Sequence, residues 1–188
     1  MRARLTALVL ICSVALALAP SGEASESRCP GADAGPDQIS VSDYAAALLC
    51  VVNETRREWG RPPLELHRNL ARAAGWQAGD MTQNDYFSHT SPDGETLLDR
   101  LDQANFIPAS DRWRAGENLA AGHADAASPA EIVDGWMNSH DHRVNLLDPR
   151  FSGAGIAASR GWPGPGAPDD DSLTVAMDLG WRTFAPRR

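Results

Sequence analysis

The 188-residue chain contains no lysine, so arginine supplies all of its fixed positive charge. This absence by itself excludes no function. The formal net charge at pH 7 is −8 with histidine neutral. Nucleic acids and anionic membrane surfaces attract basic proteins, so the acidic balance argues against both as partners.

The sequence also lacks an apolar run of comfortable length for a membrane span. The apolar run at residues 5–19 is shorter than the roughly 20 residues that a transmembrane helix needs. It follows Arg2 and Arg4 and precedes the small residues Gly22 and Ala24, a pattern that predicts a signal peptide over residues 1–24. We therefore expect a secreted protein, extracellular or periplasmic, without a transmembrane anchor after cleavage.

Cysteine is scarce, and only Cys29 and Cys50 lie outside the expected signal peptide. In an oxidising compartment such an isolated pair is expected to form a disulfide. A loop of this size would contribute about 3 kcal/mol of stability. The alternatives are a free, buried Cys50 or a metal-binding pair. The long separation argues against the metal pair, because zinc-binding cysteines are closely spaced.

The chain shows no internal repeat and no second domain. Residues 25–40, rich in Ser, Gly, Pro, Asp and Glu, are expected to form an exposed leader before a single domain at residues 41–188. Apolar residues at helical spacing predict a first helix between Ser42, its expected N-cap, and Gly60, with Trp59 on the buried stripe.

Further helices are expected over residues 69–84 and 96–104, and from a capping box at Ser128 onward. Strands are expected over 153–159 and 173–179, joined by an irregular loop at residues 161–171. Helices followed by strands predict a mixed α+β domain.

Three separate pieces carry residues with chemical potential. His89 follows the second expected helix, and a histidine there either caps a solvated helix end or takes part in proton transfer or metal binding. Glu117 lies between Gly116 and Asn118, where it either points into a pocket or caps a neighbouring helix.

The third piece, residues 139–142, has three interpretations. Two histidines flanking a carboxylate, as in His140-Asp141-His142, resemble a zinc half-site. Ser139 with these neighbours suggests a hydrolytic triad, but triad members are rarely so close and the sequence lacks a Gly-x-Ser-x-Gly elbow. The third interpretation is a helix junction with one histidine facing inward and the other facing solvent.

Taken in order, the motifs are much more specific than any single one. They are Asn53-x-x-Arg56, Gly60-x-Pro62-Pro63-Leu64, Phe87-Ser88-His89, Gly116-Glu117-Asn118-Leu119-Ala120, Trp136-Met137-Asn138-Ser139, His142-Arg143-x-Asn145-Leu146-Leu147 and Gly153-x-Gly155. This series resembles the bacterial branch of the CAP superfamily, the SCP-like domains related to cysteine-rich secretory proteins, antigen 5 and pathogenesis-related 1 proteins. The resemblance covers roughly residues 41–181.

The resemblance implies a three-layer α-β-α sandwich with a central cleft, lined in the family by two histidines and two glutamates that bind zinc or another divalent cation in some members. His89 matches the first histidine, Glu117 the first glutamate and His142 the second histidine. The second glutamate is replaced by Ser139, and Ser139, His140 or Asp141 could supply the missing group. His89 and His142 are the expected metal ligands.

The family resemblance favours a monomeric binding protein whose cleft takes a lipid, a cell-wall component or a host ligand. Two alternatives stay open. In the first, His89, Glu117 and His142 perform metal-assisted hydrolysis as a protease or a cell-wall hydrolase. In the second, the loop at residues 161–171 makes the chain a protein-interaction module.

Overall fold

The computed structural model describes residues 29–107, 112–165 and 171–183. The expected signal peptide, its cleavage site and part of the loop at 161–171 lie outside these residues. Of the described helices, none is long and apolar enough to cross a membrane.

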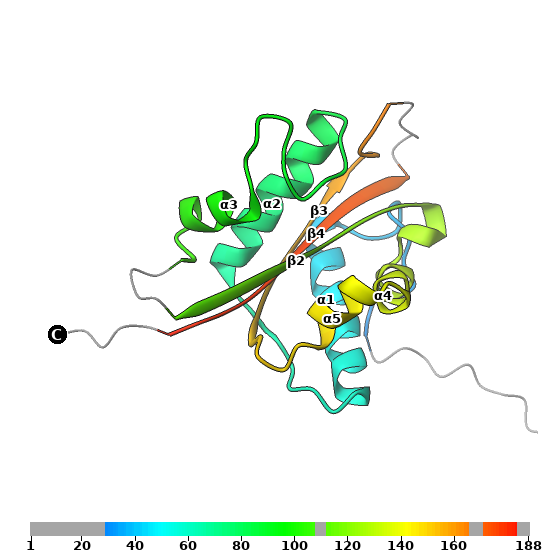
Figure 1. The fold of residues 1–188 in the computed structure, drawn as a ribbon. Helices are drawn as coiled ribbons and strands as arrows, with labels where there is room; N and C mark the ends of the chain where they lie inside the picture. Colours follow the sequence, from blue (N-terminus) through cyan, green and yellow to red (C-terminus); the bar gives the residue numbers. More distant parts are fainter. Residues whose placement is uncertain (1–28, 108–111, 166–170, 184–188) are drawn as a thin grey trace, which may run out of the picture.

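A four-stranded mixed sheet forms the middle of the molecule (Figure 1). Its strands are β1 (Glu65–Leu66), β2 (Trp113–His123), β3 (Gly153–Arg160) and β4 (Ser172–Arg182). The spatial order is β1-β3-β4-β2, with β1 parallel to β3 and the other neighbours antiparallel.

Helices cover both faces of this sheet, which confirms the predicted α-β-α sandwich (Figure 1). One face carries α2 (Arg68–Gln83) and α3 (Leu97–Gln103). The other carries α1 (Val41–Glu58), α4 (Pro129–Asn138) and α5 (His140–Leu147), and a short 3-10 helix, η1 (Ala124–Ala127), precedes α4.

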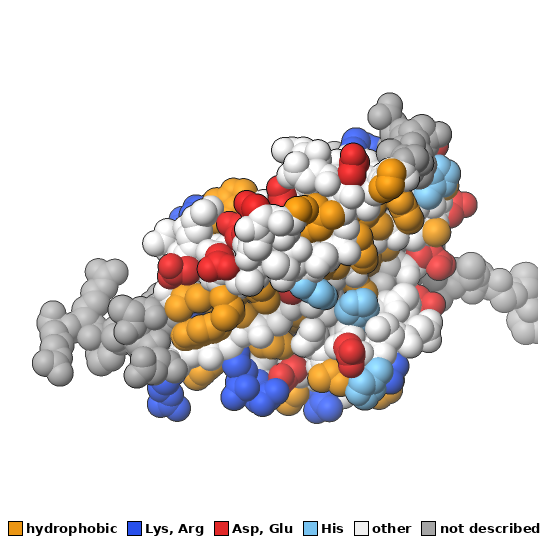
Figure 2. Space-filling model, turned by 45° about the horizontal axis from the view of Figure 1, so that its top comes forward, with side chains coloured by type: hydrophobic (Ala, Val, Ile, Leu, Met, Phe, Trp, Pro, Cys, Tyr) orange, Lys and Arg blue, Asp and Glu red, His pale blue; other side chains and the backbone are white. Residues whose placement is uncertain are grey.

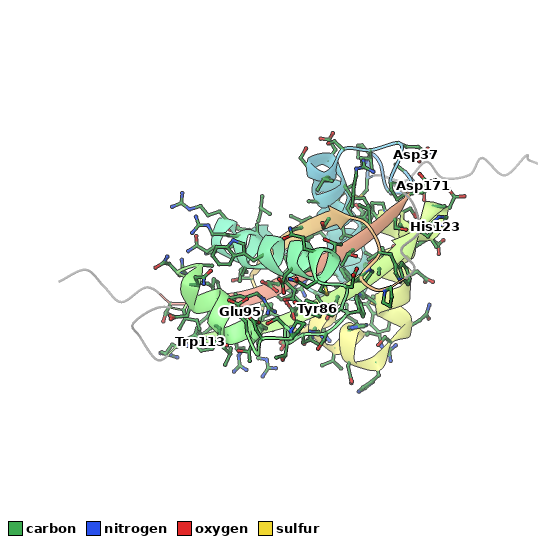
Figure 3. The ribbon with its side chains drawn as sticks, turned by 90° about the horizontal axis from the view of Figure 1, so that it is seen from above. Asp37, Tyr86, Glu95, Trp113, His123 and Asp171 are labelled. Carbon is green, nitrogen blue, oxygen red and sulfur yellow. A yellow bond between two sulfur atoms is a disulfide. The ribbon has the colours of Figure 1, made fainter. Side chains whose placement is uncertain are left out.

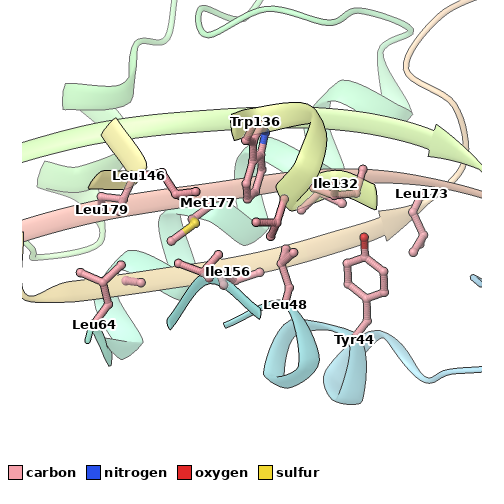
Figure 4. Close-up of a cluster of buried hydrophobic side chains, with 14 of the residues drawn as sticks. Tyr44, Leu48, Leu64, Ile132, Trp136, Leu146, Ile156, Leu173, Met177 and Leu179 are labelled. Atoms are coloured by element: carbon pink, nitrogen blue, oxygen red, sulfur yellow. The ribbon is translucent and has the colours of Figure 1, made fainter. Parts of the chain in front are cut away.

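Alternation along β4 divides the core between the two faces, because successive side chains of a strand point to opposite sides. Val175, Met177 and Leu179 pack with α1, α4 and α5, around the buried ring of Trp136 (Figure 4). Ala176 packs against α2 on the other face. The strand is buried on both sides, although its α2 face also carries the polar residues Thr174 and Asp178.

The first helix is confirmed, but two details of its prediction are wrong. Its N-cap is Ser40, whose extended backbone lets its hydroxyl accept a hydrogen bond from the Asp43 amide, and Ser42 lies inside the first turn. Trp59 is the C-cap and is 55% exposed, since the helix ends before this residue can join the buried stripe.

Residues 29–40 are not the wholly exposed leader that was expected. Cys29 and Ala32 are buried, and the Ala32 carbonyl accepts a hydrogen bond from the Ala130 amide in the first turn of α4. Cys29 forms the predicted disulfide with Cys50 of α1. The segment therefore packs against α1 and α4, two of the helices that cover one face of the sheet.

Strand β2 is the longest element that the sequence did not predict, and it shows that the expected order of helices followed by strands is wrong. Every residue of β2 pairs with one of β4, from Trp113 opposite Arg182 to His123 opposite Ser172. The strand carries Gly116, Gly122 and polar residues, which have low strand propensity. Pairing with β4 outweighs this local preference.

Candidate functional site

The structure brings His89 and Glu117 into direct contact, although 28 residues separate them in the chain. His89 lies in the connection between α2 and α3, the region of Tyr86 and Glu95 in Figure 3. Glu117 lies in β2 and faces the same side of the sheet as α2 and α3. The His89 Nδ1 and Glu117 Oε1 atoms are 2.7 Å apart.

The second carboxylate oxygen of Glu117 binds Arg100, a residue that the sequence analysis did not select. Arg100 Nη2 donates to Glu117 Oε2 at 2.9 Å and to the His89 carbonyl at 3.2 Å. The side chains of Arg100 and Glu117 are 0% and 2% exposed, so this is a buried ion pair. The available signal was an arginine on the apolar side of the short helix containing Leu97 and Leu101.

These bonds fix His89 at the surface. Its side chain is 57% exposed, and its Nδ1 is held by a carboxylate that Arg100 holds in turn. The hydrogen bond that the Glu117 carboxylate accepts raises the pKa of His89, while burial and the charge of Arg100 oppose this rise. The ring nitrogen Nε2 is the one that this contact leaves for a ligand.

His142 lies near His89 and comes from α5, on the other side of β2. Burial lowers the pKa of His142, and the charge of His89 lowers it further, against the opposing effect of Asp141. This ring therefore favours its neutral form, in which one nitrogen carries a free lone pair. Figure 2 shows histidine side chains in the middle of one face, next to hydrophobic ones.

Two asparagines hold α5 against β2. Asn118 donates to the His142 carbonyl at 3.0 Å. Asn145 donates to the Asn118 side-chain oxygen at 3.1 Å and to the Glu117 carbonyl at 3.2 Å. A Cβ at Gly116 would lie 3.1 Å from the Asn145 oxygen, so glycine at this position gives the amide room.

The segment at 139–141 forms the predicted helix junction. Ser139 ends α4 and begins α5, and its side chain makes no capping hydrogen bond. His140 and Asp141 are exposed. Within the described part of the chain no hydrogen bond links the side chains of Ser139, His140, Asp141 and His142, so no triad geometry is formed. Which of them replaces the family's second glutamate stays a prediction.

The donor set fits a metal ion only in part. Both oxygens of Glu117 already bind side chains, at His89 and Arg100, so this carboxylate orients a histidine instead of facing an ion. No group of three or more His, Cys, Asp or Glu side chains with metal-binding geometry occurs in residues 29–107, 112–165 and 171–183. Metal binding by His89 and His142 therefore stays a prediction.

A second carboxyl group that the sequence did not indicate lies behind the pair. Asp178 of β4 is the register partner of Glu117 and is 0% exposed. Neither of its oxygens has a hydrogen-bond partner among the described residues. Burial, followed by the nearby charge of Glu117, raises the pKa of Asp178 well above its ordinary value, and Arg100 opposes the rise.

Asp178→Asn is expected to stabilise the protein at neutral pH. Above the ordinary aspartate pKa of 3.8 the unfolded chain releases this proton while the folded chain keeps it, so the wild type loses stability as pH rises toward the raised pKa. Asparagine removes that dependence. The gain in Tm should grow from about pH 4 upward, by roughly 2–4 °C per kcal/mol. Thermal scans between pH 4 and pH 8 measure it, and a pH-independent difference would contradict the assignment.

The fold agrees with that of solved structures. An extracellular protein containing an SCP domain from Bacillus anthracis matches with a TM-score of 0.60 and 29% identity, over 76% of this chain and 41% of that one. An outer surface protein from Borrelia burgdorferi matches in fold with a TM-score of 0.62 and 20% identity, over 77% of this chain and 97% of that one. The class is therefore that of SCP-type α-β-α domains.

Residues 49–175 match the model of the cysteine-rich secretory protein (CAP) family, and the chain belongs to that family. The Bacillus subtilis protein YkwD is 33% identical over 117 residues, which are 62% of this chain and 43% of YkwD. The B. subtilis membrane protein YlbC is 35% identical over 113 residues, 60% of this chain and 31% of YlbC. The chain thus spans less than half the length of these two relatives.

Proposed function

We propose that this chain is an extracellular CAP domain that binds a ligand over His89 and His142, with a divalent cation such as zinc bound by the two imidazoles. The carrying observation is the fixed orientation of His89, whose Nδ1 is held at 2.7 Å by a buried carboxylate. Proteins orient a metal-binding histidine through a hydrogen bond at the ring nitrogen that does not bind the metal. The Cys29–Cys50 disulfide and the extracellular relative from B. anthracis support the location.

The same contacts favour binding over hydrolysis. A general base must be free to accept a proton from the attacking group. Glu117 is 2% exposed in its side chain, and each of its oxygens already accepts a hydrogen bond or ion pair. Ser139 makes no side-chain capping bond and no hydrogen bond to either imidazole among the described residues, so Ser139 is not held as an activated serine nucleophile.

Zinc calorimetry on wild type, His142→Ala and His140→Ala tests the cation part of this proposal. His142→Ala removes one of two ligands and is expected to weaken zinc binding by about tenfold or more. His140→Ala is the matched control, because His140 is exposed and lies two residues away on the same helix. Equal or absent binding in the wild type and His142→Ala would remove the cation from the proposal.

Native mass spectrometry of protein purified without added metal tests the ligand. A carried lipid would identify an apolar ligand, whereas a cell-wall fragment or a host glycan added to the protein would register as a mass increase. The mass increase should be absent from His89→Ala. A mass increase that both His89→Ala and His142→Ala retain would place the ligand elsewhere.

A further inference from the structure

We propose that a second surface of this protein binds an acidic glycan chain. We call this surface the arginine groove. It consists of Arg61, Pro62, Pro63, Arg114, Arg143, Pro149, Arg150 and Trp181. Its residues do not include His89, Glu117 or His142, so the proposal stands independently of the binding function proposed for those residues.

The groove consists of two hollows that adjoin along Pro149 and Arg150. One, of about 440 Å³, is lined by residues of α5 and of the loop after it, together with Arg61. The other, of about 510 Å³, is lined by Pro62, Pro63 and Trp181 among others. Pro149 and Arg150 line both, so a chain-like ligand could lie across the two.

The charge of the groove is opposite to that of the whole chain, which carries −8. Among the described residues, Asp148 is the only acidic one that lines either hollow. Arg150 already binds it through hydrogen bonds from Nε to Oδ1 at 2.8 Å and from Nη2 to Oδ2 at 2.6 Å. Arg61, Arg114 and Arg143 therefore remain as an excess of positive charge, and Figure 2 shows arginine side chains along the lower edge of its face.

A further guanidinium lies beneath the groove. Arg56 is fully buried and donates to the carbonyls of Pro62 at 2.8 Å and Leu146 at 2.6 Å, so it holds together the two loops that form the groove. Burial lowers the pKa of Arg56, and the charge of Arg61 lowers it further while Asp148 opposes. Asp148 has the larger effect of these two charges, so Arg56 serves the groove by holding its loops together and not by adding free charge.

The composition of the lining favours a carboxylate-bearing sugar chain. Planar guanidinium groups bind carboxylates through paired hydrogen bonds. The second hollow adds Pro62, Pro63 and the partly exposed ring of Trp181, flat apolar surfaces that suit the apolar faces of sugar rings. A nucleic acid would instead meet the net acidic remainder of the chain, which disfavours a long phosphate backbone.

Calorimetry with a galacturonate hexamer tests this inference. The wild type is expected to bind the hexamer and to bind the fully methyl-esterified hexamer at least about tenfold more weakly, since esterification removes the charge and keeps the sugar chain. Affinity for the acid form should fall as salt rises. Equal affinity for both hexamers would overturn the proposal. So would equal affinity for inorganic phosphate, or tighter binding of a short single-stranded DNA.

Two matched double variants test whether the groove or the net charge of the protein determines hexamer binding. Arg61→Ala with Arg114→Ala removes two exposed groove arginines and should weaken hexamer binding by about tenfold or more. Arg68→Ala with Arg72→Ala removes two exposed arginines of α2 and should leave binding unchanged. Equal losses in both variants would show that net charge and not the groove binds the glycan. Thermal scans confirm that both are folded.

Discussion

Gly155→Ala is expected to destabilise the protein by at least about 3 kcal/mol, the largest effect of a single methyl group in this fold. A Cβ at Gly155 would lie 1.9 Å from the Ala71 nitrogen and 2.0 Å from the Leu70 carbonyl carbon. Both are backbone atoms of α2, so no side chain can rotate to make room. Helix α2 would have to move away from β3 and so disrupt the packing of the α2 face of the sheet.

Urea denaturation of Gly155→Ala tests this expectation, with Gly135→Ala as the control. Gly135 lies inside α4, and a Cβ there would meet no atom within 4 Å. Alanine favours a helix interior over glycine by about 1 kcal/mol, so this control should stabilise the protein. If Gly155→Ala unfolds at the wild-type urea concentration, then α2 does not lie as close to β3 as described.

Arg100→Met is expected to destabilise the protein by about 3–5 kcal/mol at neutral pH. The substitution keeps an apolar stem in the space beside α3 but leaves the Glu117 carboxylate buried without its cation. It also removes the donor to the His89 carbonyl, so the segment that carries His89 loses an anchor.

The double variant Arg100→Met with Glu117→Leu distinguishes the cost of an unpaired buried carboxylate from the cost of altered packing. Replacing both partners with apolar groups removes the unpaired carboxylate, so the double variant should be more stable than Arg100→Met alone. Chemical denaturation at pH 7 measures both. A double variant that is less stable than Arg100→Met by the full cost of a second substitution would mean that the ion pair is not the source of the effect.

The candidate site shows why motif spacing and tertiary geometry give different information. The spacing of His89, Glu117 and His142 predicted one site from three distant pieces. The structure joins His89 to Glu117 and brings His142 near His89, and a single site made by all three stays a prediction. The motif spacing did not reveal that Glu117 is paired with Arg100. Arg100 belongs to no motif, and its burial depends on how α3 packs.

The sequence by itself determined the local elements and the family. Helical periodicity and caps located α1, α2, α3 and the start of α4, and the apolar runs located β3 and β4. The spacing of its motifs indicated the CAP family, and the lone cysteine pair indicated the Cys29–Cys50 disulfide. These features depend on residues close in the chain or on a pattern that the family shares.

The tertiary structure alone decided what depends on distant partners. Strand β2 has little strand propensity of its own and exists through its pairing with β4. The burial of Arg100 and of Asp178 and the arginine groove likewise arise where segments far apart in sequence meet. Burial, ion pairing and the shape of a groove depend on these tertiary contacts. The periodicity within one segment does not predict them.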